Sequence, residues 1–207
     1  MEAVMKAFGP SDRIVSPMIA GLSLLLSVPA IAIVGGAIPS AEGIGRSVIT
    51  IVGSRGNFCT GVLIAPKLVL TVAHCVQPGA VYKIVDYGQN QQPQLHDVRT
   101  IAIHPAFNMQ AIIAHRASAD LALLQLESPP QAKQAAVFAS PQAPIVAGSA
   151  FSIAGVGVAI RGEGKSGGTV PTGPNGGAGC GGLTGVTPLT LYRDWILQTA
   201  RGWGSAM

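Results

Sequence analysis

The strongest constraint on the fold is a series of short runs rich in β-branched and aliphatic residues, each bounded by turn-forming residues. Phe58–Ile64 and Leu68–Val72 are separated only by Ala65-Pro66-Lys67, which predicts two strands joined by a turn. The other runs predicted as strands are Ser47–Val52, Tyr82–Tyr87, Val98–Ile103 and Asp120–Leu126. This succession favours an all-β protein.

The composition supports a β-rich, loop-rich chain and excludes several functional classes. Hydrophobic residues make up 48% of the 207 residues and charged residues only 11%, against about 25% in an average globular protein. Glycine, at 27 residues, is about twice as frequent as usual. The formal charge of +4 is spread thinly and no Lys/Arg run occurs, so we expect no nucleic-acid partner. The four histidines lack metal-ligand spacing, and we expect no metal and no cofactor.

Two motifs carry the functional information. Thr71-Val72-Ala73-His74-Cys75 is followed, 46 residues after its histidine, by Asp120-Leu121-Ala122-Leu123-Leu124. These segments resemble the histidine and aspartate motifs of the trypsin/chymotrypsin-like serine proteases. The resemblance implies a double β-barrel with a C-terminal helix, in which His74 is the general base and Asp120 orients its imidazole. Two further segments resemble later parts of that fold, Phe151–Gly157 a strand opening the second barrel and Tyr192–Ile196 the C-terminal helix.

The nucleophile that the resemblance implies is missing. The family carries its serine in a Gly-Asp-Ser-Gly-Gly stretch, and the chain has none. Ser166 is a weak candidate, because it has glycines around it but Lys165 in place of the aspartate. It lies only 46 residues after Asp120, about half the family's distance, and better fits a solvated Gly-rich loop. Residues 161–182 show no strand signal, so we expect an incomplete second barrel with its gap between Gly168 and Cys180.

The chain has three cysteines, Cys59, Cys75 and Cys180. The family resemblance implies a disulfide between Cys59 and Cys75, which would tie the histidine loop to the neighbouring strand. Cys180 is then left over, which indicates an intermolecular bond, a free thiol or a lost partner. A catalytic thiol at this position is a further, weaker alternative.

Residues 1–32 have the pattern of a secretory signal peptide. Lys6 and Arg13 precede the apolar stretch Met18–Val28, and Ala30-Ile31-Ala32 fits a cleavage site. An uncleaved membrane anchor is the alternative. Cleavage would make Ile33 the mature N-terminus, and Ile33-Val34-Gly35-Gly36 resembles the mature N-terminus of trypsin-like proteases. We therefore expect a secreted or periplasmic peptidase domain over 33–207, with a first barrel over 33–130 and a truncated second barrel and C-terminal helix over 131–207.

These observations predict a trypsin-like serine endopeptidase domain that is catalytically inactive as written. A non-catalytic homologue that binds peptides or a partner protein is the main alternative. A degenerate product that folds poorly and an active protease using Ser166 are the others. We expect a monomer that takes a peptide or protein substrate or ligand, and contact with a membrane only if the N-terminal segment is uncleaved.

Overall fold

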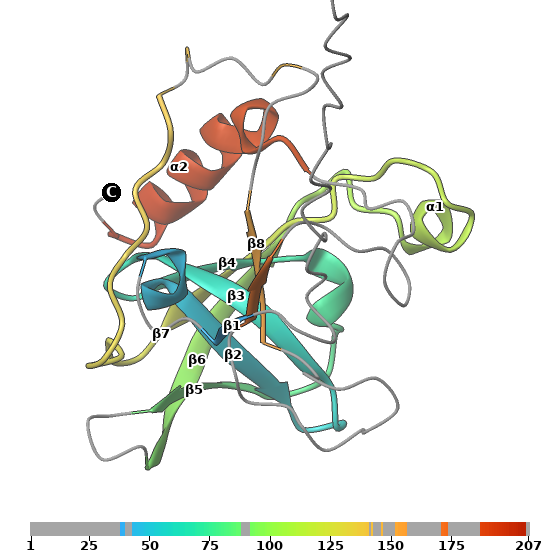
Figure 1. Ribbon diagram of the computed structural model, residues 1–207. Helices are drawn as coiled ribbons and strands as arrows, with labels where there is room; N and C mark the ends of the chain where they lie inside the picture. Colours follow the sequence, from blue (N-terminus) through green and yellow to red (C-terminus); the bar gives the residue numbers. More distant parts are fainter. Residues whose placement is uncertain are drawn as a thin grey trace, which may run out of the picture.

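A computed structural model of the chain describes residues 38–39, 43–87, 92–140, 142, 146, 152–156, 171–173 and 187–205. Its main element is a closed antiparallel barrel with the strand order β2-β3-β4-β7-β6-β5 (Figure 1). The strands are β2 (Val48–Gly53), β3 (Phe58–Ala65), β4 (Leu68–Thr71), β5 (Tyr82–Tyr87), β6 (Pro93–Ile103) and β7 (Ala122–Leu126). The sequence therefore predicted the all-β class and the strands of this barrel.

A second, smaller sheet contains β1 (Ile38–Pro39), β8 (Ile153–Ala154) and β9 (Pro171–Gly173) in the order β1-β9-β8. Within the described residues after position 130, β8 and β9 are the only strands and no second barrel closes, in agreement with an incomplete second barrel. The expectation of no strand within 161–182 was wrong, because β9 lies there. A strand of three residues needs only backbone pairing, and its proline stands at the first position, where a missing N–H is tolerated.

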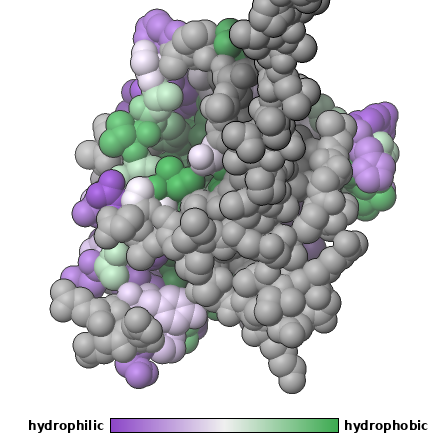
Figure 2. Space-filling model, in the orientation of Figure 1, coloured by the Kyte–Doolittle hydropathy of each residue, from purple (hydrophilic) through white to green (hydrophobic). Residues whose placement is uncertain are grey.

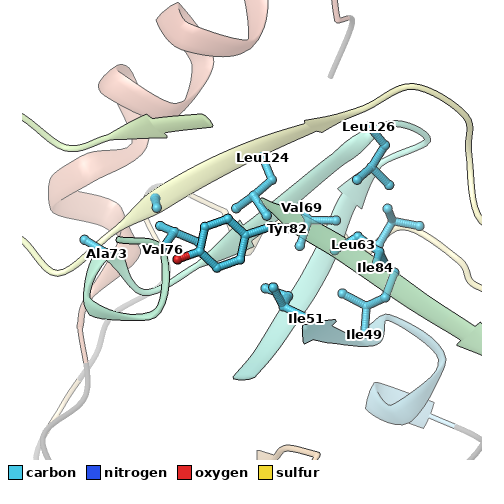
Figure 3. Packing of buried hydrophobic residues seen from close by; sticks show 11 residues of the cluster. Ile49, Ile51, Leu63, Val69, Ala73, Val76, Tyr82, Ile84, Leu124 and Leu126 are labelled. Atoms are coloured by element: carbon cyan, nitrogen blue, oxygen red, sulfur yellow. The ribbon is translucent and has the colours of Figure 1, made fainter. Parts of the chain in front are cut away.

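The barrel interior is filled by aliphatic side chains from alternate positions of the strands, around one tyrosine (Figure 3). A side chain at Gly61 would force its neighbours to move, because a Cβ there would lie 2.6 Å from Val69 Cγ1 and 2.9 Å from Ile51 Cδ1. The buried members of this interior cluster are Ile49, Ile51, Leu63, Val69, Ala73, Val76, Tyr82, Ile84, Ala122, Leu124 and Leu126.

The outer face of β4 and β7 is buried as well, beneath the C-terminal helix α2 (Arg193–Gly202). Ile196, which is 0% exposed, packs there with Leu68 and Leu123. Burial on both faces explains why β4 is apolar at almost every position rather than alternating. The other helices of the described residues are the 3₁₀ turns η1 (Gly43–Arg46), η2 (Ala73–Cys75) and η3 (Leu189–Tyr192), and the α-helix α1 (Met109–Ile113).

After β7 the chain runs along the outside of the barrel as an extended connector, residues 129–138. Its backbone N–H groups donate to the carboxylate of buried Asp86 from Ala132, at 3.0 Å, and to the Leu63 carbonyl from Ala136, at 2.7 Å. Half-burial of Lys133 lowers the pKa of its ammonium group, and the nearby Asp86 partly opposes that shift. Figure 2 shows hydrophobic surface among hydrophilic groups on the side where the connector and α2 lie. No helix among the described residues is long and apolar enough to cross a membrane.

Candidate active site

His74 lies in the turn that follows β4. The strand ends at Thr71, whose hydroxyl donates to the Thr60 carbonyl of β3 at 2.8 Å. The chain then closes the short turn η2, in which the Cys75 N–H donates to the Val72 carbonyl at 3.2 Å. The histidine is thereby placed at the rim of the barrel, immediately beyond a strand that is buried on both faces.

Asp120 reaches the same rim from the other direction. It lies two residues before β7, which is antiparallel to β4 with Thr71 opposite Ala122. The carboxyl end of β4 and the amino end of β7 therefore meet. The approach of the chain is fixed by the His104 N–H, which donates to the Leu121 carbonyl at 2.9 Å. Strand register thus brings together two residues that are 46 positions apart.

The Asp120 carboxylate contacts His74 twice. Oδ2 lies 2.6 Å from imidazole Nδ1, and Oδ1 accepts the backbone N–H of His74 at 2.9 Å. The carboxylate side chain is only 13% exposed, whereas the imidazole is 47% exposed. An anion in contact with Nδ1 favours the tautomer with its proton on that nitrogen, which leaves the Nε2 lone pair to accept a proton. The pair can therefore act as an oriented general base.

A disulfide joins Cys59 of β3 to Cys75, the residue after the histidine. The two Cα atoms are 6.2 Å apart, and the bond closes a loop with a sequence separation of 16. It links η2 to β3, so the turn that carries His74 is attached to the barrel by the disulfide as well as by the backbone.

Each residue of the pair lines a cavity. His74 lines one of about 330 Å³ together with the disulfide and the side chains of Arg55 and Tyr82. Asp120 lines another of about 250 Å³, whose walls are mostly apolar and include Leu70.

Ser166, Ile33, Cys180 and the predicted signal segment 1–32 lie outside the described residues. His104, the residue after β6, packs edge-on against the rings of Tyr192 and Trp195, at 5.1 and 4.9 Å between ring centres. Burial there lowers the pKa of His104. Within the described part of the chain no three His, Cys, Asp or Glu side chains gather as metal ligands.

Sequence motifs gave no indication of two polar residues behind the histidine turn. Asn57 Nδ2 donates to the Cys75 carbonyl at 2.9 Å, and the Tyr82 hydroxyl accepts the Gln77 N–H at 2.6 Å. An asparagine in a turn and a tyrosine in a strand are ordinary at those positions, so only the fold reveals that they meet.

Comparisons with known proteins agree with the fold. The family model described as Trypsin matches residues 33–172. The solved structure described as "Structure of GrC" superposes with a TM-score of 0.53 at 22% sequence identity, over 69% of this chain and 63% of that one. The chain thus spans about 63% of the length of that protein, and the likeness shows a shared fold.

Proposed function

The chain belongs to the trypsin-like serine protease family, and from this premise we propose that it is a serine endopeptidase domain by descent that retains only half of its catalytic machinery. His74 is the general base and Asp120 is the carboxylate that orients it. The observation that carries the proposal is the double contact of the Asp120 carboxylate, 2.6 Å to Nδ1 and 2.9 Å to the backbone nitrogen of the same histidine. A structural aspartate at a strand end has no need of the ring contact.

In a complete enzyme of this kind, His74 would take the proton of a serine hydroxyl as that oxygen attacks a peptide carbonyl. Asp120 would hold the imidazole in the correct tautomer and stabilise the imidazolium that forms. The expected substrates are peptides or proteins. The sequence, however, contains no Gly-Asp-Ser-Gly-Gly segment, and Lys165 beside Ser166 supplies no carboxylate for a buried N-terminal amine. We therefore propose that the chain as written has no measurable peptidase activity.

A second candidate function is a peptide- or protein-binding module. The cavity of about 330 Å³ beside His74 supports it, because a site without turnover can still hold a side chain. An extended peptide would be retained rather than cleaved, and its affinity would fall in variants that fill this cavity.

We further propose the arrangement of the whole chain. Residues 1–32 are a signal peptide and 33–207 a monomeric peptidase domain, secreted or periplasmic, with Ile33 as its mature N-terminus. The disulfide between Cys59 and Cys75 supports an oxidising compartment.

The decisive experiment is labelling with a fluorophosphonate probe, which reacts with activated serines, followed by mapping of the adduct by mass spectrometry. Oxidised protein that elutes as a compact monomer is used beside Ser166→Ala and His74→Ala variants. We expect no adduct on any of them. An adduct on Ser166 that both substitutions abolish would establish an active hydrolase and refute the proposed inactivity.

A further inference from the structure

Behind the His74 turn lies a closed hydrogen-bond network that the family motifs do not include. Asn57 Nδ2 donates to the Cys75 carbonyl at 2.9 Å and to the Tyr82 hydroxyl oxygen at 3.2 Å. The same oxygen accepts the Gln77 N–H at 2.6 Å, and its proton is directed to the Gln77 carbonyl at 3.3 Å. Two side chains thus bind the backbone on the C-terminal side of the histidine.

The network uses the full capacity of the Tyr82 hydroxyl and both amide protons of Asn57, whose Oδ1 has no hydrogen-bond partner among the described residues. A tyrosine hydroxyl has one proton and two lone pairs, and Tyr82 engages all three. The two amide protons of Asn57 are likewise both used. Rotating the Asn57 amide by half a turn would set its oxygen against the Cys75 carbonyl oxygen, so its orientation is determined.

Both side chains are themselves held in place. The Tyr82 ring is 2% exposed in the barrel interior, and its oxygen points toward the segment of Ala73 and Val76 (Figure 3). Asn57 ends the β2–β3 turn, where its carbonyl accepts the Gly53 N–H at 2.9 Å. A Cβ at Gly53 would lie 2.1 Å from Asn57 Oδ1, so the glycine leaves the space that the amide occupies.

We propose that Asn57 and Tyr82 are positioning residues for His74, an inference that rests on the proposed role of His74 as a base. Asp120 fixes the N-terminal side of the turn, through the backbone nitrogen and Nδ1 of His74. The disulfide fixes the side chain of Cys75, and the Val76 N–H of the next peptide unit donates to the Ala73 carbonyl at 3.1 Å. Asn57 binds the Cys75 carbonyl and Tyr82 binds the backbone N–H and carbonyl of Gln77, which together fix the distance of the turn from the barrel. The Asp120 carboxylate contacts both the backbone nitrogen and Nδ1 of His74, so a small displacement of the turn would lengthen at least one of these two contacts.

The test uses the full oxidised chain with Tyr82→Phe and Asn57→Asp, each of which preserves shape and removes hydrogen-bonding groups. Tyr87→Phe is the matched control, because Tyr87 is on the same strand and is 43% exposed. The measurement is the solvent exchange rate of the His74 Nδ1 proton by nuclear magnetic resonance, assigned with His74→Gln, beside the free energy of unfolding. Loss of about one net hydrogen bond should speed that exchange about tenfold in both variants and leave it unchanged in the control.

Wild-type exchange in both variants, whatever their stability, would overturn the inference and leave a purely structural network. Absence of a protected His74 proton in the wild-type protein would instead refute the proposed His74–Asp120 pair, and the inference with it. If one variant unfolds, the exchange rate of the other variant alone tests the inference, because Tyr82→Phe and Asn57→Asp remove different members of the same network. Rescue of slow exchange by Asn57→Gln, which restores an amide donor, would support positioning further.

Discussion

Gly61→Ala provides the sharpest test of the barrel packing. Gly61 does not have a positive φ, so the substitution adds only a methyl group and no backbone strain. That methyl would lie 2.6 Å from Val69 Cγ1 and 2.9 Å from Ile51 Cδ1. Ordinary carbon contacts are about 3.5 Å or more, so a β4 side chain has to move by roughly 1 Å in a close-packed interior.

The expected magnitude follows from two opposing terms. Overpacking of this kind costs roughly 1–3 kcal/mol. Replacing glycine with alanine also restricts the unfolded chain, which returns about 0.4–1 kcal/mol. We therefore expect Gly61→Ala to lower the free energy of unfolding by about 1–2 kcal/mol, measured by urea denaturation of the oxidised protein. Gly202→Ala is the control, because a Cβ there meets nothing within 4 Å, and it should be neutral or slightly stabilising.

A double mutant separates packing from other causes. Val69→Ala removes the methyl group that the new Cβ would strike, so Gly61→Ala should cost at least about 1 kcal/mol less in that background than alone. Equal stability of Gly61→Ala and Gly202→Ala, or simple additivity in the double mutant, would refute the reasoning and show that β3 and β4 are not packed as described.

Three further predictions concern the disulfide, the helix and the pH dependence. Replacing Cys59 and Cys75 with alanine should lower the free energy of unfolding by about 3 kcal/mol, and reductant should have the same effect on the wild-type protein only. Ile196→Ala should cost about 2–5 kcal/mol in a denaturation experiment, because the side chain is fully buried, while exposed Gln198→Ala should change little. Burial lowers the pKa of His104 below its ordinary value of 6.5, so the unfolded chain binds the extra proton. The free energy of unfolding is therefore highest above pH 6.5 and decreases as the pH falls from 6.5 through the lowered pKa of His104. The His104→Gln variant should show a smaller decrease of melting temperature over the same pH range.

The sequence predicted the barrel strands well where their own residues favour strands. β5 spans the predicted Tyr82–Tyr87. β6, by contrast, begins at Pro93, five residues earlier than predicted, because its first half contains Gln, His and Asp and becomes a strand only by pairing with β5. The five-residue helix α1 was not predicted. It is too short to show a helical period and depends on Asn108, whose side chain accepts two N–H groups at its start.

For the site, the motifs identified the two residues that the fold brings into contact, but not what supports them. His74 and Asp120 sit in runs of distinctive composition. Asn57 and Tyr82 meet only because β2, β3 and β5 are neighbours in the barrel, and no local pattern reports a contact between residues 25 positions apart. Strand register and cross-strand neighbours depend on how distant segments pair, and local sequence patterns do not specify that pairing.

The pairing of Thr71 with Ala122 has a consequence for how such a chain evolves. A slip of one residue between these strands would exchange the side chains of the barrel interior with those that pack under α2, so selection for a packed fold also preserves the register. The same register carries His74 to Asp120. Mutations that abolish catalysis therefore need not separate His74 from Asp120. The contact between the two residues is retained for as long as selection maintains the folded barrel. In this fold an intact histidine–aspartate contact indicates that the first barrel is folded. Evidence for catalysis has to come from the second barrel.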